Sequence, residues 1–230
     1  LVNLNYKLDL VNEDDNRQIS SISFNSKNVE KGSLFVCLVG ENFDAHNFVE
    51  DAVRNGASAI LAQKNLQGLP IPVVVVENTA QSMSLLSTAL YGFHSSKLKL
   101  IGVTGTNGKT TVTHLVEKIL ESAGMQCGLI GTLGNRLKSQ DKYKETKHTT
   151  PQSPDLQEYL ANAVEDKIDY VVMEVSSHAL DLYRVLGCDF SVALLTNVTQ
   201  DHLDFHVTMD NYTRAKMKLF KQLIPSKKKK

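Results

Sequence analysis

The chain contains no tryptophan and has only three cysteines and five prolines in 230 residues. Cys37, Cys127 and Cys188 stand apart from one another, and an odd number of cysteines without paired spacing is typical of reduced thiols. Charge of one sign is not in excess, because 25 basic residues balance 25 acidic ones. The sequence also lacks an apolar run of membrane-spanning length and a signal peptide at residues 1–10. We therefore expect a cytoplasmic protein whose partners include neither nucleic acid nor a membrane.

Strand and helix patterns alternate along the chain in two regions that meet near residue 97. The first region predicts strands at Leu34–Val39, Ala59–Ala62 and Val73–Val76, and helices at His46–Asn55 and Ala80–Phe93. The second predicts a helix from Pro154, strands at Tyr170–Met173 and Phe190–Leu195, and a helix at Met209–Ile224. Strands that are apolar throughout are typical of a parallel sheet covered on both faces. The predicted fold is a small α/β domain (1–97) followed by a mostly parallel, P-loop-type sheet domain (98–230).

The most informative segment is the glycine-rich stretch Ile101–Thr111, IGVTGTNGKTT, which overlaps an apolar run at Leu100–Val103. Apolar residues after it recur at the spacing of a helix that packs on a sheet: Val112, Leu115, Val116, Ile119, Leu120 and Ala123. A strand, a glycine-rich turn and a helix in this order predict a phosphate-binding loop. The general motif has glycine where this chain has Val103, so a turn without a ligand remains the alternative.

Each residue type in this loop suits the binding of phosphate. Gly105 and Gly108 allow the backbone to curl, so that consecutive N–H groups converge on an anion at a helix N-terminus. Lys109 adds a full positive charge, and the hydroxyl of Thr110 can bind Mg²⁺. ATP is the expected ligand, but the loop alone does not indicate what the phosphate is used for.

Two charged residues outside the loop stand at positions that suggest a site. Glu174 ends an apolar strand, where the Mg²⁺ of a nucleotide would be held, although a glutamate facing solvent is the alternative. Lys216 lies on the stripe that Tyr212 and Leu219 mark on the last helix, which predicts that it points inward. Its ammonium either reaches back to the surface or is desolvated, with a lowered pKa.

A pair of histidines, His202 and His206, is four residues apart and would share one face of a helix. The segment lacks the glutamate of the zinc-protease motif and has no nearby cysteine. We therefore favour one histidine at a Mg²⁺ or phosphate site and a structural role for His206.

Five segments resemble the Mur ligase family in its order and spacing, over essentially the whole chain. They are GTNGKTT at 105–111, HTTP at 148–151, MEVSSHAL at 173–180, TNVTQDHLDFH at 196–206 and YTRAKMKLF at 212–220. The members that add a diamino acid are the most similar. The resemblance implies a monomeric, ATP- and Mg²⁺-dependent ligase that joins L-lysine or meso-diaminopimelate to UDP-N-acetylmuramoyl-dipeptide through an acyl phosphate, for the synthesis of peptidoglycan. The site residues that it implies fall into four groups.

The resemblance implies that ATP is held by Gly105, Thr106, Asn107, Gly108, Lys109, Thr110 and Thr111. One Mg²⁺ would be held by Thr110 and Glu174, and a second by Glu174, His202 and a carbamylated Lys216. Lys109, Glu174, His202 and Lys216 would be the catalytic residues. Ser26 would contact the uridine, although Asn25-Ser26-Lys27 replaces the family's Asp-Ser-Arg, and the muramoyl-peptide would be held by Thr149, Thr150, Ser176 and Arg184.

Residues 1–97 would then bind the UDP-sugar, and residues 98–230 would form the N-terminal part of the central ATP-binding domain. The family's C-terminal amino-acid-binding domain is expected to be absent. Two alternatives remain: a sibling amide ligase of the folylpolyglutamate or cyanophycin synthetase type, and a non-catalytic module that binds UDP-muramoyl-peptide.

Overall fold

The computed structural model describes residues 7–9, 18–40 and 43–223. The chain divides into two units, Leu1–Leu90 and Tyr91–Lys230. This division falls before the expected boundary at residue 97, because the 3₁₀ turn η3 (His94–Lys97) packs against elements of the second unit. Ser95 Oγ, for example, accepts a hydrogen bond from the Asp189 N–H at 3.1 Å. Within the described ranges, none of the helices has both the length and the apolarity that a membrane span requires.

The first unit contains a five-stranded sheet with the order β1-β7-β6-β3-β2, parallel except for β1. Its strands are β1 (Lys7–Asp9), β2 (Ser21–Ser23), β3 (Ser33–Val36), β6 (Ala59–Ala62) and β7 (Val73–Val75), with a separate hairpin of β4 (Val39–Gly40) and β5 (Phe43–Asp44). The helices are η1 (Ser26–Asn28), η2 (Ala45–Phe48), α1 (Val49–Arg54) and α2 (Thr79–Leu90). Side chains of β3 alternate between the two faces: Phe35 packs with Val49 and Ala52 of α1, and Leu34 and Val36 pack with Met83 of α2.

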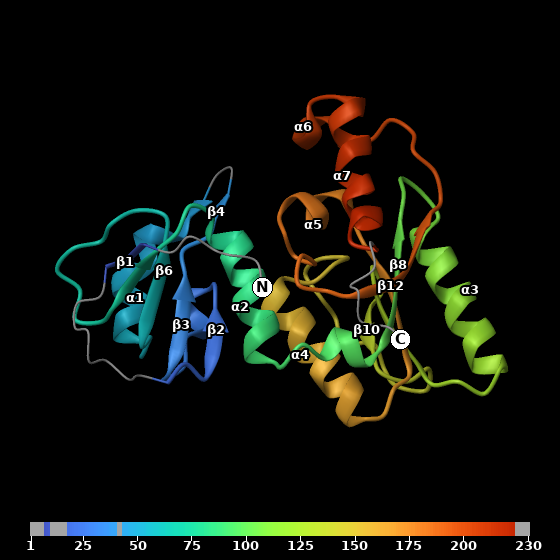
Figure 1. Cartoon of the computed structure of the whole chain (residues 1–230), viewed down its shortest axis with the longest axis horizontal. Helices are drawn as coiled ribbons and strands as arrows, with labels where there is room; N and C mark the ends of the chain where they lie inside the picture. Colours follow the sequence, from blue (N-terminus) through green and yellow to red (C-terminus); the bar gives the residue numbers. More distant parts are fainter. Residues whose placement is uncertain (1–6, 10–17, 41–42, 224–230) are drawn as a thin grey trace. The chain divides into compact units, whose positions relative to one another are not determined.

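The second unit has a sheet of the order β10-β9-β11-β8-β12, parallel except for β10. Figure 1 labels β8, β10 and β12 of this sheet. Its strands are β8 (Lys99–Thr104), β9 (Cys127–Gly131), β10 (Gly134–Arg136), β11 (Tyr170–Glu174) and β12 (Phe190–Leu195). Its helices are α3 (Lys109–Ser122), α4 (Ser153–Glu165), α5 (Ser177–Asp181), α6 (Leu203–His206) and α7 (Met209–Lys221). The mixed α/β class with mostly parallel strands is confirmed. The end of the last predicted helix, Ile224, and the tail Lys227–Lys230 lie outside the described residues.

Helices cover both faces of this second sheet. Val116 and Leu120 of α3 pack on Val103 of β8, and Leu160 of α4 and Leu219 of α7 belong to the core on the opposite face. The expectation that every apolar strand is covered is wrong for β12, whose side chains of Val192 and Leu195 are 43% and 44% exposed. The reason is its position, since β12 is the outermost described strand beside β8.

The predicted buried stripe of α3 is also partly wrong. Leu115 and Ile119 are 57% and 67% exposed, whereas Thr113 and Glu117 are fully buried. The helix is rotated because its first turn is fixed by the glycine-rich loop, and because Arg136 pairs with the buried Glu117 carboxylate. Local periodicity finds the helix but not the polar partners that select its inward face.

One backbone position in the second unit is strained. Val207 joins α6 to α7 with φ 67° and ψ −42°, and the Thr208 N–H donates to the His206 carbonyl at 2.8 Å, which makes a γ-turn. A β-branched residue at positive φ costs on the order of 1–3 kcal/mol. The side chain is 74% exposed, so it gains little from packing.

Val207→Gly is therefore expected to raise the free energy of unfolding of the second unit by about 1 kcal/mol, the relief of strain less the extra entropy of glycine in the unfolded chain. Urea unfolding, monitored by hydrogen exchange in each unit separately, measures this change in the free energy of unfolding. The control is Val39→Gly, at another exposed valine without positive φ, which should lose stability. If Val207→Gly and Val39→Gly lower the free energy of unfolding equally, the backbone at Val207 is not strained.

Candidate functional site

The loop between β8 and α3 has the backbone geometry of a phosphate cradle. β8 ends at Thr104 and α3 begins at Lys109, and both glycines between them have positive φ, 148° at Gly105 and 85° at Gly108. A Cβ at Gly105 would lie 1.9 Å from Thr196 Oγ1, so this position also needs glycine for space. The predicted strand, turn and helix are confirmed at this point of the chain.

The segment after β12 braces the loop. The Thr106 N–H donates to the Asn197 carbonyl, and the Asn107 N–H donates to Asn197 Oδ1, both at 3.0 Å. The Thr196 hydroxyl donates to the Asn107 carbonyl at 2.7 Å. Thr106 and Asn107 are thus held by residues of the TNVTQDHLDFH segment, whereas Thr111 lies exposed in the first turn of α3.

Two lysines share one carbonyl of this loop. Lys109 Nζ donates to the carbonyls of Gly105 and Thr106 at 2.9 Å each, and Lys216 Nζ donates to the Gly105 carbonyl at 2.8 Å. Lys216 is only 2% exposed, so the prediction that it points inward is confirmed. Burial and the nearby Lys109 charge lower the pKa of Lys216 to about 8, although Asp201 opposes the shift. Burial likewise lowers the pKa of Lys109.

A buried carboxylate lies against the same loop. Glu174 is 1% exposed at the end of β11, and its Oε1 accepts hydrogen bonds at 2.9 Å from the Thr110 hydroxyl and from the Thr132 N–H. Its Oε2 accepts from the Thr132 hydroxyl at 3.2 Å. A Cβ at Gly131 would come within 2.4 Å of Oε1, so glycine is needed there too. The solvent-facing alternative for Glu174 is therefore excluded.

This pair of oxygen donors fits a magnesium ion, which prefers one or two carboxylates together with hydroxyls, water and phosphate oxygens. The groups that donate hydrogen bonds to the Glu174 carboxylate belong to Thr110 and Thr132 and are neutral, and Mg²⁺ is a stronger partner for a carboxylate than such donors are. Within the described part of the chain, no three or more His, Cys, Asp or Glu side chains are grouped so that they could hold a metal ion. The second predicted set, Glu174, His202 and carbamylated Lys216, stays a prediction.

The prediction that His202 and His206 lie within one helix is wrong, because His202 stands before α6 with φ 51°. Their rings nevertheless contact the same side chain, His178, with centroid distances of 4.8 and 5.5 Å. His206 is buried, and its Nδ1 lies 3.1 Å from Asp181 Oδ2, in agreement with a structural role. Burial lowers the pKa of His206, against the opposing effect of Asp181.

The residues predicted to hold the muramoyl-peptide gather beyond the end of β11. Thr150 is fully buried; its hydroxyl donates to the Glu174 carbonyl at 2.9 Å, and its carbonyl accepts from Arg184 Nη1 at 3.0 Å. The Ser176 N–H donates to the Thr150 hydroxyl at 3.1 Å. Thr149 is only half-buried, with Oγ1 3.2 Å from Thr132 Oγ1. Thr150 therefore anchors this region, while the hydroxyl of Thr149 lies nearer its surface.

Thr132 was missed by the sequence analysis. The Thr132 N–H and hydroxyl both donate to the Glu174 carboxylate, and the same hydroxyl oxygen lies within hydrogen-bond distance of Thr149 Oγ1. Thr132 thus connects the phosphate loop to the residues predicted to hold the muramoyl-peptide. The available signal was its position directly after the buried run 127–131, at the carboxyl end of a parallel strand, where functional residues collect.

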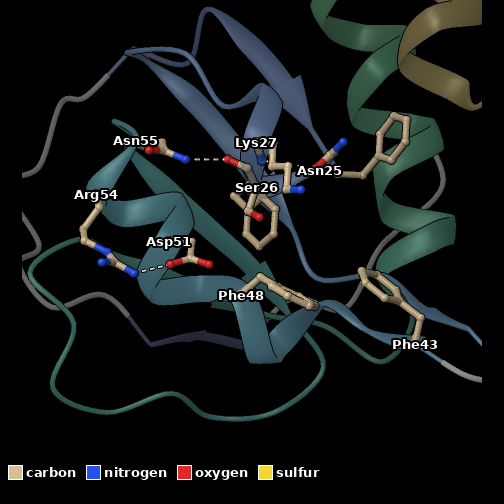
Figure 2. Close-up of a pocket in the computed structure, with 10 residues that line it drawn as sticks. Asn25, Ser26, Lys27, Phe43, Phe48, Asp51, Arg54 and Asn55 are labelled. Atoms are coloured by element: carbon tan, nitrogen blue, oxygen red, sulfur yellow. Dashed lines mark hydrogen bonds and ion pairs between the residues drawn. The ribbon is translucent and has the colours of Figure 1, made fainter.

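The first unit holds a pocket of its own, with a volume of about 550 Å³. Figure 2 shows the stacked Phe43 and Phe48 rings at one end and the Asp51–Arg54 ion pair at the other. Ser26 lies on its wall, and the Ser26 carbonyl accepts a hydrogen bond from Asn55 Nδ2 at 2.8 Å. The remaining lining residues are Phe24, Asn25, Lys27 and Phe35. The pocket thus combines flat apolar rings with a few polar groups.

A glycine-rich loop between a parallel strand and a helix, with lysine and threonine at the helix start, defines the second unit as an α/β domain of the phosphate-loop class. Residues 103–228 match the Mur ligase middle domain, and residues 18–89 match the domain described as Mur ligase family, catalytic domain. The chain belongs to the Mur ligase family.

Two curated relatives are named UDP-N-acetylmuramoyl-L-alanyl-D-glutamate–2,6-diaminopimelate ligase. The protein from Bacillus velezensis is 49% identical over 89% of this chain and 41% of its own length. A protein from Clostridium acetobutylicum with the same name, numbered 1, is 47% identical over 94% of this chain and 44% of its own length. A solved structure of a ligase of this name matches with a TM-score of 0.76 and 30% identity, over 88% of this chain and 41% of that one. The chain therefore spans less than half the length of these relatives.

Proposed function

We propose that this chain supplies the nucleotide-phosphate site and the UDP-sugar site of an ATP-dependent ligase that adds diaminopimelate to UDP-N-acetylmuramoyl-L-alanyl-D-glutamate. The observation that carries the proposal is the convergence of Lys109, Lys216, Thr110 and Glu174 on one glycine-rich loop. The relatives that share close to half of its residues are named for this reaction. Their names favour diaminopimelate over lysine.

The loop would hold the β- and γ-phosphates of ATP. Lys109 Nζ now rests on two carbonyls of the loop and would turn to phosphate oxygens, which are stronger acceptors for an ammonium. Gly105, Thr106, Asn107, Gly108 and Thr111 would complete the cradle; the Thr106 and Asn107 N–H groups are already bonded to Asn197, so the remaining amides and Lys109 would carry most of the contact.

Thr110 and Glu174 would hold one Mg²⁺, and Glu174, His202 and a carbamylated Lys216 a second. A bound Mg²⁺ neutralises charge that develops on the phosphate oxygens. Carbamylation needs a neutral amine, and the lowered pKa of Lys216 supports this modification. Since the carbamate is an anion, it would also replace the repulsion between the ammonium groups of Lys216 and Lys109 with an attraction.

The reaction that fits this arrangement has two steps. The terminal carboxylate of the muramoyl-dipeptide attacks the γ-phosphorus of ATP, ADP leaves, and an acyl phosphate forms. The amine of diaminopimelate then attacks the acyl carbon and loses a proton, and phosphate leaves. Positive groups around the loop would stabilise charge in both transition states. The peptide would be held, close to its reacting carboxylate, by Thr149, Thr150, Ser176 and Arg184.

The pocket of the first unit would bind the uridine end of the substrate, with Ser26 as a polar contact. The flat Phe43 and Phe48 rings suit a planar base, and the pocket volume of about 550 Å³ is in the range of small-molecule sites. Residues 1–97 would be the UDP-sugar domain and 98–230 the front of the ATP-binding domain. We propose that the protein is a monomer and that it is cytoplasmic; the three free, buried cysteines support the second point.

The test is a ligation assay with ATP, Mg²⁺, UDP-N-acetylmuramoyl-L-alanyl-D-glutamate and diaminopimelate, read as tripeptide product by mass spectrometry. A protein that carries this chain at the full length of its relatives is expected to form the product. The 230-residue chain alone should bind substrate but form no product, because positioning the amine and the acyl phosphate together contributes on the order of 7–11 kcal/mol. Absence of product from the longer protein would overturn the proposed activity. If that longer protein binds the substrate without turning it over, the non-catalytic module is favoured instead.

A further inference from the structure

The last residue of β10 is fixed to helix α3 by a buried ion pair. The Glu117 carboxylate is fully buried, and it accepts hydrogen bonds from Arg136 Nε at 3.1 Å and from Nη2 at 2.7 Å. The third guanidinium nitrogen, Nη1, donates to the Ser139 carbonyl at 2.8 Å. The bidentate geometry fixes the orientation of the guanidinium as well as its position. Residues 136–139 therefore cannot shift relative to α3 without exposing or breaking this pair.

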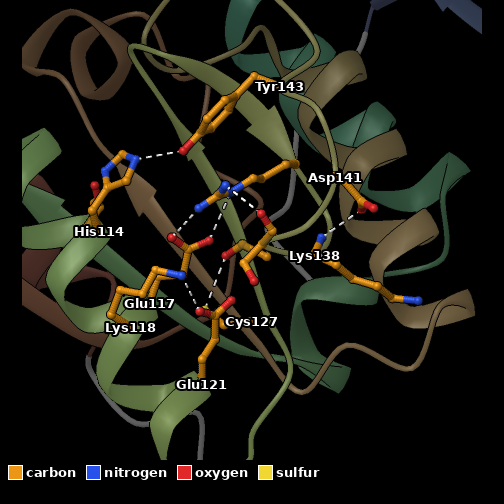
Figure 3. Close-up of polar contacts among 12 residues, drawn as sticks. His114, Glu117, Lys118, Glu121, Cys127, Lys138, Asp141 and Tyr143 are labelled. Carbon is orange, nitrogen blue, oxygen red and sulfur yellow. Dashed lines mark hydrogen bonds and ion pairs between the residues drawn. The ribbon is translucent and has the colours of Figure 1, made fainter.

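One turn closer to the phosphate loop, a second contact joins the same two elements (Figure 3). The Tyr143 ring lies over the Arg136 guanidinium, 4.6 Å from ring centroid to Cζ, and the Tyr143 hydroxyl lies 2.8 Å from His114 Nε2. His114 Nδ1 lies 2.8 Å from the Thr110 carbonyl oxygen. His114 and Glu117 are three residues apart on α3, so they face the segment together.

The hydrogen-bond directions along this path follow from the atoms. A carbonyl oxygen can only accept, so Nδ1 of His114 carries the hydrogen and donates to Thr110. In the neutral ring Nε2 then accepts, and the Tyr143 hydroxyl donates to it. The imidazole thus uses both nitrogens to connect Tyr143 to the backbone of the threonine whose hydroxyl bonds Glu174. All three hydrogen bonds on this path, Tyr143 to His114, His114 to Thr110 and Thr110 to Glu174, are made by side chains and lie outside the backbone ladders of helix and sheet.

The segment that carries Tyr143 leads directly to the substrate side. Its next residue, Lys144, forms a two-way backbone bridge with Asn135 at 2.8 and 2.9 Å, and the chain then reaches Thr149 and Thr150. The Tyr143 hydroxyl therefore contacts His114 on the side of the phosphate loop. The chain that follows Tyr143 leads to Thr149 and Thr150, which we propose contact the peptide.

We propose that Tyr143 is a positioning residue, which acts through His114 on the Thr110 backbone and thereby holds the phosphate loop in its binding geometry. The nucleotide part of this inference rests on the proposed function. Loss of the Tyr143–His114 hydrogen bond is expected to loosen the first turn of α3 and to weaken nucleotide binding. The size of one neutral hydrogen bond predicts a loss of about 3- to 10-fold in affinity.

The experiment uses the 230-residue chain and the variants Tyr143→Phe and His114→Asn. Phenylalanine keeps the ring over Arg136 and removes only the hydroxyl. Asparagine keeps a donor for the Thr110 carbonyl and removes the partner of Tyr143. The matched control is Tyr170→Phe, at a tyrosine whose hydroxyl accepts a hydrogen bond from Lys99 Nζ at 3.4 Å, at the opposite end of β11. Thermal unfolding of each variant measures any general loss of stability.

Two measurements follow each variant: hydrogen exchange of the first-turn amides of α3 without ligand, including the Val112 N–H bonded to Gly108, and calorimetric titration with Mg·ADP. Both variants should raise the exchange rate and weaken binding about equally, and the double variant should lose no more than either one alone. Tyr170→Phe should change neither quantity.

Unchanged exchange in Tyr143→Phe, or additive effects in the double variant, would overturn the proposed role of Tyr143. If exchange rises as expected but the wild-type chain does not bind Mg·ADP, the positioning of the loop holds and the proposed nucleotide site fails. If Tyr143→Phe lowers the unfolding temperature as a general effect, the His114→Asn exchange pattern decides: protection lost along all of α3 contradicts the proposal, and loss confined to its first turn supports it.

Discussion

Lys216→Ala is expected to lower the rate of ATP-dependent ligation by about 10²- to 10³-fold or more, in a protein that carries this chain at the length of its relatives. Lys216 is buried against the phosphate loop, and its modified form would supply charge at the acyl-transfer step. Nucleotide affinity should change far less than the rate, because the variant keeps Lys109, the lysine that would turn from the Gly105 carbonyl to the phosphates. Initial rates and Kd for Mg·ATP measure the two effects separately.

The fold should survive this substitution. Alanine removes a desolvated ammonium and its repulsion with Lys109, so we expect no loss of thermal stability. Lys218→Ala is the control, because Lys218 lies on the same helix with its side chain 42% exposed and paired with Asp181 at 2.6 Å. It should keep a near wild-type rate. A near wild-type rate for Lys216→Ala would mean that neither its charge nor its carbamate takes part in the reaction.

Arg136→Met is expected to destabilise the second unit by about 3–5 kcal/mol, because it leaves the Glu117 carboxylate buried without a partner. Burial works against the charge of Arg136, but the Glu117 carboxylate outweighs it and raises the pKa of the guanidinium. Denaturant unfolding followed by probes in each unit measures the loss, since two units need not unfold together.

Two further variants separate the loss of the ion pair from the loss of an arginine. The double variant Glu117→Leu/Arg136→Met removes both charges and should recover most of the stability, because apolar side chains can replace a buried ion pair at little cost. Arg54→Met removes an arginine from the exposed pair with Asp51 and should change stability by less than about 0.5 kcal/mol. A double variant as unstable as Arg136→Met would show that the loss comes from packing and not from the unpaired charge.

The parts of the site that sequence reasoning found are those determined by local order along the chain. Gly105, Gly108 and Lys109 identify the loop because a strand, a tight turn and a helix must follow one another there. The position of Lys216 on an apolar stripe was enough to predict that it points inward, but not whether its ammonium reaches the surface. The structure decides this second point, because Lys216 is only 2% exposed. The strand before Glu174 likewise indicated where the carboxylate would lie.

The parts that were missed depend on the order of strands in the sheet. Thr132 reaches Glu174 only because β9 lies next to β11, and this neighbour relation is not written in either segment. The exposure of Val192 follows from the edge position of β12 in the same way. The prediction of which face of α3 points inward was wrong because it used only the sequence of the helix. The residue that pairs with Glu117 is Arg136, which lies on strand β10.

The most direct test of the central claim, that residues 105–111 hold the phosphates of a nucleotide, is calorimetric titration of a non-hydrolysable ATP analogue with Mg²⁺ into the wild-type chain and Lys109→Ala. We expect saturable binding to the wild type and a loss of affinity of at least about 10-fold in the variant, because Lys109 brings a full charge to the cradle through charge-assisted hydrogen bonds. Equal affinity of the two proteins would show that Lys109 does not contact the phosphates and that this loop is a structural turn.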